Sequence, residues 1–184
     1  MKLYLASTSP RRRELLKSLN ISFEVIAPNF EEQPTGLSPD EEVLHFAEAK
    51  ALSVEAQCPE SLVLGSDTLI TIEGIILGKP IDEADAVKML QKLSTKTHIL
   101  YTAVVLLNTK DKSLKKHLEE VKVTFRTLSE KEIKDYVVTG EPMDKAGAYA
   151  IQGGAKDFVT KVEGDLEAVI GLPLEPIRNW LGIT

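Results

Sequence analysis

A run near the start of the chain has the residue types that bind anions. From Ser7 to Arg13 it combines hydroxyl side chains with three arginines, between an apolar stretch and an amphipathic one. Ser9 suits the N-cap of a helix and Pro10 its first position, so free backbone N–H groups would point to the same place as Arg11 and Arg12. Such N–H groups attract anions, and guanidinium groups fork onto phosphate oxygens. The run predicts either a phosphate site or a capped helix with a solvated basic turn. Three cations that oppose the helix dipole favour a bound anion.

Carboxylates in two places have the type that Mg²⁺ prefers. Asp67 follows an apolar run and is expected at the carboxyl end of a strand, where ligands of α/β sheets gather. A lone aspartate also commonly caps a turn. Glu31 and Glu32 lie in a predicted loop after another strand. Carboxylates from separate loops hold Mg²⁺ over phosphates, with water completing its coordination, so the sequence predicts a metal site of this kind.

Three further polar residues have two interpretations each. Lys79 stands in the stiff turn Gly78-Lys79-Pro80, either as a surface lysine or as a phosphate ligand. Lys50 is either a surface lysine too, or its alanine neighbours let its stem lie buried on a close-packed helix with its ammonium at a cleft. Gln152 lies in a block of small residues, Asp144 to Gly154, that permits either close approach to a ligand or merely close packing of two elements. Its amide carries a donor and an acceptor, as reading the edge of a pyrimidine requires. None of these residues alone identifies a site.

The elements that position these residues alternate along the chain, which predicts a mixed α/β domain. Strands are expected at 2–6, 22–27, 61–66, 69–77, 97–108 and 117–127, with extended chain near 147–152 and 157–162 and a hairpin through Glu73-Gly74. Capping boxes at Ser38 and Ser129 predict two helix starts, and Gly140 a helix end. Further helices are expected around 86–93 and 173–181.

Composition excludes several classes of protein. The chain has 184 residues, 43% hydrophobic and 27% charged, with a net charge of −6. The acidic balance argues against a nucleic-acid partner, whose phosphates need clustered cations. No apolar run has the roughly 20 residues needed to cross a membrane, and no signal peptide is expected. The single cysteine, Cys58, fits a cytoplasmic protein.

Six sequence blocks, in order and across nearly the whole chain, resemble the Maf family of nucleoside triphosphate pyrophosphatases. They are Leu5 to Arg12, Gly65 to Thr68, Gly78 to Pro80, Glu141 to Tyr149, Ile151 to Gly153 and Val169 to Leu174. The resemblance implies one domain over residues 1–184. Its fold would be a mixed twisted sheet with flanking helices, in two lobes around a deep cleft, similar to inosine triphosphate pyrophosphatases.

The resemblance also implies the reaction. A nucleoside triphosphate would be hydrolysed to the monophosphate and diphosphate with Mg²⁺ or Mn²⁺, as part of nucleotide-pool house-cleaning. Arg11, Thr68 and Gln152 follow the type that acts on dTTP and UTP. A sister type acts on 7-methyl-GTP and carries Trp, Gln and Glu at these positions. Gly164-Asp165-Leu166 departs from the Gly-Ser-Tyr of many relatives, so no role is carried over to that loop.

Combined with the residue chemistry, the resemblance assigns roles. Triphosphate binding falls to Ser7, Ser9, Arg11 and Arg12, with Lys50 and Lys79 adding positive charge as diphosphate leaves. Glu32 and Asp67 would hold the metal, and Asp67 would activate the attacking water. Arg12, Thr68 and Gln152 would read the base.

The partners expected are the nucleotide substrate and a second copy of the chain, since a homodimer is the family expectation. A different class of function stays open, because the family is also linked to cell-division arrest. The chain would then be a nucleotide-binding regulator acting through a protein contact. Asp67, Glu32 and Lys79 favour an enzyme, because a pure sensor needs no carboxylate to activate water.

Overall fold

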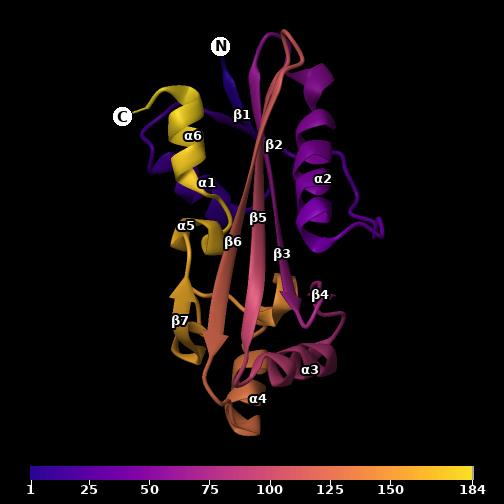
Figure 1. Cartoon of the computed structure of the whole chain (residues 1–184), viewed down its shortest axis with the longest axis vertical. Helices are drawn as coiled ribbons and strands as arrows, with labels where there is room; N and C mark the ends of the chain where they lie inside the picture. The colour runs from indigo at the N-terminus through magenta and orange to yellow at the C-terminus, as the bar shows by residue number, and fades with distance from the viewer. Residues whose placement is uncertain (184) are drawn as a thin grey trace. The chain divides into compact units, whose positions relative to one another are not determined.

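The computed structural model describes residues 1–183, in which strands are interspersed with helices (Figure 1). The strands are β1 Leu3–Ala6, β2 Glu24–Ile26, β3 Leu62–Ile72, β4 Ile75–Leu77, β5 Thr97–Asn108, β6 Leu114–Phe125 and β7 Val159–Glu163. The α-helices are α1 Pro10–Lys17, α2 Pro39–Leu52, α3 Glu83–Leu93, α4 Glu130–Val138, α5 Leu166–Ile170 and α6 Leu174–Leu181. Short 3-10 helices cover Glu55–Gln57, Glu141–Asp144, Ala146–Ala148 and Lys156–Phe158. Within residues 1–183, no helix is both long enough and apolar enough to cross a bilayer.

The strands form one mixed sheet. Its order is β2-β1-β3-β5-β6-β7, and β4 pairs with β3. β1 is parallel to both β2 and β3, whereas the β3–β4 and β6–β7 pairs are antiparallel. The predicted mixed α/β fold with flanking helices is therefore confirmed.

The chain divides into two compact units. Unit 1 comprises Met1–Thr68, Thr102–Glu119 and the segment from Gly171 to the C-terminus, and unit 2 comprises Leu69–Tyr101 and Glu120–Ile170. The long strands β3, β5 and β6 contribute residues to both units. The expectations of a cleft between two lobes and of a single domain over 1–184 stay predictions.

In unit 1, the strand β1 is packed on both of its faces. Alternate residues of a strand point to opposite faces, so Leu5 packs in one cluster with Leu16 and Ile177 from α1 and α6. Its neighbour Ala6 packs in a second cluster with Ala51 of α2. Figure 1 shows α2 along one side of these strands and α6 along the other. Helices on both faces explain why β1 and the neighbouring start of β3 are largely apolar and buried.

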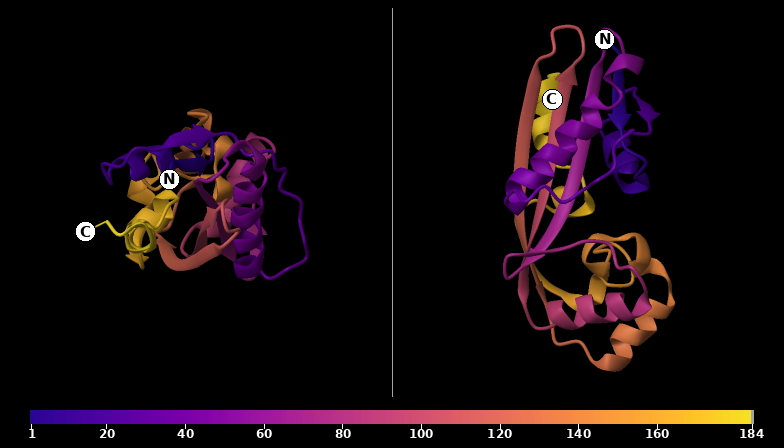
Figure 2. Two further views of the ribbon diagram at one scale, coloured as in Figure 1. Left: turned by 90° about the horizontal axis from the view of Figure 1, so that it is seen from above. Right: turned by 90° about the vertical axis from the view of Figure 1, so that its right-hand side faces the viewer.

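Unit 2 has an aromatic core. Phe125 contacts His98, Tyr149 and Phe158 edge to face, at centroid distances of 5.1, 4.9 and 6.1 Å. The helices α3 and α4 lie side by side in this unit (Figure 2). Tyr149 comes from the small-residue block Asp144 to Gly154, so part of that block is buried structure.

Most predicted elements are confirmed, with two corrections. The strands predicted at 61–66 and 69–77 are one continuous strand, β3, followed by the Glu73-Gly74 turn and β4. The polar Ser66, Asp67 and Thr68 look like a strand end, but the ladder continues because Leu69 and Ile70 are buried beyond them. Extended chain near 147–152 was also wrong. A 3-10 turn stands there instead, with Gly147 at φ 66° and Ala148 at φ 60°.

Candidate active site

The loop after β1 forms the helix start that the sequence predicts. The Ser9 side chain caps α1 by accepting a hydrogen bond from the Arg12 backbone N–H at 3.4 Å, and Pro10 takes the first helical position. Ser7 is buried, and its Oγ accepts from the Ser9 N–H at 3.2 Å. The first turn contains no acidic residue. It therefore keeps the positive character that an anion site requires.

Asp67 lies in the middle of β3, so its predicted place at the end of that strand was wrong. The last pair between β1 and β3 joins Ala6 to Gly65, two positions before Asp67. Asp67 is thus placed where the parallel neighbour β1 has ended and its loop begins. The rule that ligands gather at the carboxyl ends of strands applies here to β1.

Lys50 connects the two predicted metal-binding carboxylates. Its Nζ lies 2.5 Å from Asp67 Oδ1 and 2.6 Å from Glu32 Oε1. Lys50 and Asp67 are both buried, whereas the Glu32 side chain is 43% exposed. Lys50 is buried, as the interpretation with its stem along a close-packed helix predicted, and its place at a cleft stays a prediction.

Close packing of α2 on β3 brings Lys50 to Asp67. A Cβ added at Gly65 would lie 2.2 Å from the Ala47 carbonyl oxygen and 3.0 Å from Ala51 Cβ. Only glycine leaves room for the helix backbone at that distance. This close contact therefore sets the position along β3 at which Lys50 meets Asp67.

The loop that carries Glu32 is attached to α2 on both sides of that residue. Before it, the Asn29 N–H donates to Ser53 Oγ at 3.1 Å, and the Phe30 ring packs on Phe46 at 5.8 Å. After it, the Thr35 hydroxyl donates to the buried carboxylate of Glu42 at 2.8 Å. An irregular loop rich in polar residues thereby places a carboxylate at a defined position.

Burial dominates the electrostatics of Asp67. It raises the pKa of this carboxyl above its usual range, and the charges of Lys50 and Arg12 oppose that rise. Burial also lowers the pKa of the Arg12 guanidinium. Asp67 Oδ2 is buried and has no hydrogen-bond partner among residues 1–183. A carboxylate with a raised pKa and one unused oxygen is suited to accept a proton or bind a cation.

The donor set fits a hard divalent cation. Asp67 and Glu32 converge on a single cation, the Lys50 ammonium, and Asp67 retains an unpaired oxygen. In the part of the chain that the structure describes, no cluster of three or more Asp, Glu, His or Cys residues could hold a metal. Mg²⁺ commonly takes only one or two carboxylates and completes its shell with phosphates and water. The two carboxylates thus match Mg²⁺ or Mn²⁺ bound together with a phosphorylated ligand.

Arg12 turns toward β3 and the segment that follows α5. Its Nε donates to the Gly171 carbonyl oxygen at 2.9 Å and its Nη2 to Thr68 Oγ1 at 3.1 Å. The Ser66 hydroxyl donates to the same Gly171 oxygen at 3.1 Å. The structure thus brings together Arg12 and Thr68, which the sequence analysis assigned to one task. Arg11 is partly buried in the same helical turn.

Lys79 and Gln152 are exposed residues of unit 2. The Gly147 N–H donates to the Gly78 carbonyl oxygen at 3.0 Å, which joins the turn of Lys79 to the small-residue block. Gln152 lies in an irregular turn within that block. The roles of both residues stay predictions.

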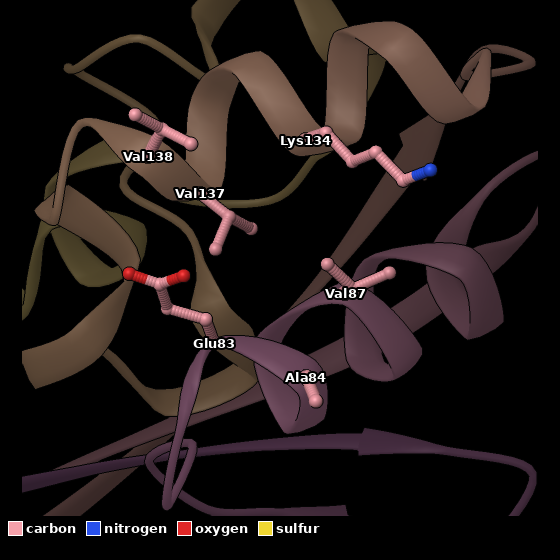
Figure 3. Close-up of a pocket in the computed structure, with 6 residues that line it drawn as sticks. All are labelled: Glu83, Ala84, Val87, Lys134, Val137 and Val138. Carbon is pink, nitrogen blue, oxygen red and sulfur yellow. The ribbon is translucent and has the colours of Figure 1, made fainter.

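A pocket of unit 2 contains none of the predicted site residues. It lies between α3 and α4 (Figure 3) and is lined by Glu83, Ala84, Val87, Lys134, Val137 and Val138. Its walls are mostly aliphatic, and its two charged groups are an acid and a base on different helices. It offers no group of donors suited to phosphate.

Sequence reasoning missed several residues around Arg12 and Glu32. Ser66, Thr102 and Gly171 complete the hydrogen bonds near Arg12, and Glu42 anchors the loop of Glu32. One available signal was the threonine at the start of the apolar run Ala103 to Leu107, where a hydroxyl is buried with apolar neighbours. The other contacts join parts of the chain far apart in sequence, which local patterns do not reveal.

Comparison with known proteins defines the class. The model of the family described as Maf-like protein matches residues 2–183, and the chain belongs to this family. The predicted family membership is confirmed.

Individual relatives share the whole length. The chain is 44% identical over 184 residues to the dTTP/UTP pyrophosphatase of Carboxydothermus hydrogenoformans, covering 98% of this chain and 99% of the relative. It is 47% identical over 174 residues to the dTTP/UTP pyrophosphatase of Bacillus cytotoxicus, covering 94% and 90%. Among solved structures, the Staphylococcus aureus Ham1 protein matches at 17% identity and a TM-score of 0.49, over 86% of this chain and 91% of that one. That likeness is too weak to add to the fold described above.

Proposed function

We propose that this protein hydrolyses dTTP and UTP to the nucleoside monophosphate and diphosphate. The observation that carries the proposal is the buried meeting of Asp67 and Lys50 with Glu32, next to the arginine-bearing start of α1. Full-length relatives at 41–47% identity are named for this reaction. The geometry of the site supports phosphate chemistry. The names of the relatives support dTTP and UTP as the nucleotides.

In the proposed reaction, water attacks the α-phosphorus and the bond to the oxygen that bridges the α- and β-phosphorus breaks. The N–H groups of the first α1 turn, with Arg11, bind the phosphates. Asp67 accepts the proton of the attacking water. Lys50 and Lys79 neutralise the charge that develops on the departing diphosphate.

Glu32 and Asp67 would hold Mg²⁺ or Mn²⁺. The bound metal would supply a Lewis acid that offsets negative charge on the phosphates. Lys50 holds both carboxylates at hydrogen-bond distance, so these two ligands are oriented by the protein itself. This limits the reorganisation needed when metal and nucleotide bind together.

For base recognition we propose Arg12, Thr68 and Gln152. Two of these residues meet in unit 1, and Gln152 is exposed in unit 2. A site that recognises a base by hydrogen bonds leaves its own polar groups unpaired when the wrong base enters. We therefore expect a preference for pyrimidine nucleotides over ATP and GTP.

In the cell, we propose a cytoplasmic homodimer that removes unwanted nucleotides and has neither a nucleic-acid nor a membrane partner. The net charge of −6 and the single cysteine support this view. The dimer is expected from the family resemblance alone. Light scattering of the purified protein measures it directly.

The test of the function is diphosphate release from a panel of dTTP, UTP, ATP, GTP and 7-methyl-GTP with and without Mg²⁺. With Mg²⁺ present, we expect the highest kcat/KM for dTTP and UTP. Without metal, we expect no diphosphate release. A preference for 7-methyl-GTP would leave the reaction standing and contradict the base choice. Tight nucleotide binding without diphosphate release from any member of the panel would favour a regulator that acts through a protein contact.

A further inference from the structure

Hydrogen bonds on two sides hold the Arg12 guanidinium, and one of them leads through Thr68 to a buried threonine. Arg12 Nη2 donates to Thr68 Oγ1, and Thr68 Oγ1 lies 3.0 Å from Thr102 Oγ1. On its other side, Arg12 Nε donates to the Gly171 carbonyl oxygen. Thr102 is 0% exposed and belongs to β5, which neighbours β3 in the sheet. All four residues of this hydrogen-bond network lie in unit 1.

The donor and acceptor roles in this network are limited by chemistry. A guanidinium only donates, so Thr68 Oγ1 must accept from Arg12. The Thr68 hydroxyl still has its own proton and a second lone pair, and Thr102 Oγ1 pairs with one of them. The contact with Thr102 therefore fixes the rotamer in which Thr68 presents its oxygen to Arg12.

Fixing the guanidinium fixes what it offers to a ligand. Arginine has five N–H donors in one plane, and Gly171 and Thr68 use two of them. Three donors remain, two on Nη1 and one on Nη2. The hydrogen bonds to Gly171 and Thr68 fix the direction in which these three donors point. Acceptor atoms of a bound nucleotide would meet a prearranged set of donors, which reduces the cost of binding.

Packing alone does not require a hydroxyl at position 102. The neighbouring Ala103, Val104 and Val105 are fully buried apolar residues of the same strand. Valine has nearly the shape of threonine and suits a strand interior at least as well. A buried hydroxyl needs hydrogen bonds, and Thr102 makes one of its contacts with Thr68, the residue that accepts from Arg12.

We propose that Thr102 is a positioning residue that sets the Arg12 guanidinium through Thr68 and so determines nucleotide affinity and base preference. The proposal rests on the proposed nucleotide hydrolysis and adds a residue that does not itself touch the substrate. Arg12 contacts the nucleotide in both the ground state and the transition state. Loss of its alignment therefore raises KM and changes kcat little.

The test compares Thr102→Val with Thr102→Ser and with a matched control, Thr109→Val. Thr109 is a buried threonine of the same unit whose hydroxyl donates to the Cys58 carbonyl oxygen at 2.6 Å. For each variant we would measure kcat and KM for dTTP and GTP, the Kd of α,β-methylene-dTTP by calorimetry, and the unfolding midpoint. Thr102→Val is expected to raise KM and Kd about tenfold, the loss of one good hydrogen bond, and to lower the dTTP:GTP ratio of kcat/KM.

The controls separate positioning from folding. Thr102→Ser keeps the hydroxyl and is expected to restore KM, Kd and the base preference. Thr109→Val is expected to lower the unfolding midpoint without a change in KM. Because Thr102 acts through Thr68, the double variant Thr68→Val/Thr102→Val is expected to bind no more weakly than Thr68→Val alone.

The results that overturn the proposal are distinct from a failure of the proposed function. A wild-type protein that neither cleaves nor binds the pyrimidine nucleotides overturns both. Wild-type activity with unchanged KM, Kd and base preference in Thr102→Val overturns only the role of Thr102. The role of Thr102 is also overturned if the effects of Thr68→Val and Thr102→Val add in the double variant. A rise of KM in Thr109→Val as large as that in Thr102→Val would overturn it as well.

Discussion

The two units of the chain differ in whether charged side chains are buried. Unit 1 contains all three buried charged residues of the described chain, Glu42, Lys50 and Asp67. Unit 2 buries the neutral His98 and Tyr149 among aromatic rings and exposes the residues assigned to the site, Lys79 and Gln152. Burying a charged group costs free energy. In unit 1, the buried charges include Lys50 and Asp67, the residues to which the proposed reaction assigns a role. Unit 2 instead has a neutral aromatic core and carries its polar groups Lys79 and Gln152 on its surface.

Removal of the divalent metal is the strongest way to test the role of unit 1. EDTA is expected to abolish diphosphate release and Mg²⁺ or Mn²⁺ to restore it, because the acidic residues there are hard oxygen ligands. Glu32→Gln is expected to raise the Mg²⁺ concentration for half-maximal rate at least tenfold. Its matched control is Glu31→Gln, the exposed neighbour in the same loop. Full activity after exhaustive chelation would contradict the metal role of both carboxylates.

A methyl group at Gly65 tests the close packing that delivers Lys50. Gly65→Ala is expected to lower the free energy of unfolding by about 1–3 kcal/mol, because the added Cβ overlaps the α2 backbone. Displacement of α2 would also lower kcat by moving Lys50 away from Asp67. Chemical denaturation and steady-state kinetics measure the two effects.

The control for this change is Gly78→Ala, where an added Cβ meets nothing within 4 Å. It is expected to leave the unfolding free energy nearly unchanged. A Gly65→Ala variant with wild-type stability and kcat would show that α2 yields freely and that the lysine does not depend on this contact.

Gln152→Glu tests whether an exposed residue of unit 2 reads the base. The change replaces an amide donor by a carboxylate that repels the carbonyl oxygens of a pyrimidine. The dTTP:GTP ratio of kcat/KM is expected to fall roughly tenfold, the scale of one hydrogen bond. Gln91→Glu, an exposed change on α3, is the control. An unchanged ratio would remove Gln152 from base recognition.

The neutral core of unit 2 predicts a pH effect on stability. Burial lowers the pKa of His98 to about 4, against 6.5 for the free side chain. The unfolded chain therefore binds more protons between these values, so stability falls as pH drops from about 6.5 to 4 and is level above that range. The full loss is on the order of 3 kcal/mol.

Denaturant unfolding at pH 7 and pH 4.5 measures this effect. His98→Gln is expected to flatten the dependence, whereas His45→Gln, on exposed α2 surface, leaves it in place. A wild-type protein whose stability does not change over this range would mean that His98 is solvated in the folded state. Activity at neutral pH is expected to respond least to His98→Gln among the changes proposed.

Local chemistry made much of this structure predictable. Ser9 with Pro10 and the capping boxes at Ser38 and Ser129 predicted three helix starts, because caps act over a few residues. Asp67 was recognised by residue type although its place in the strand was misjudged. Its environment depends on where a different strand, β1, ends, and this is a property of the sheet.

Contacts between distant segments were not predictable. The meeting of Lys50 with Asp67 depends on a glycine that admits α2, and that of Arg12 with Gly171 joins residues 159 positions apart. The Glu32 loop shows no periodicity, and its order comes from Glu42, Ser53 and Phe46 on α2. Such positions follow from packing, which a single sequence does not encode in any local pattern.

The central claim, that the buried cluster of unit 1 carries out the chemistry, is tested most directly by Asp67→Asn at saturating Mg²⁺. The variant keeps the shape of the side chain and loses the base. We predict a kcat for dTTP lower by about 10² to 10⁴, with a Kd for α,β-methylene-dTTP within about threefold of wild type. Asp111→Asn, in an exposed turn of the same unit, serves as the control and should match wild type. A near-normal kcat in Asp67→Asn would contradict the claim.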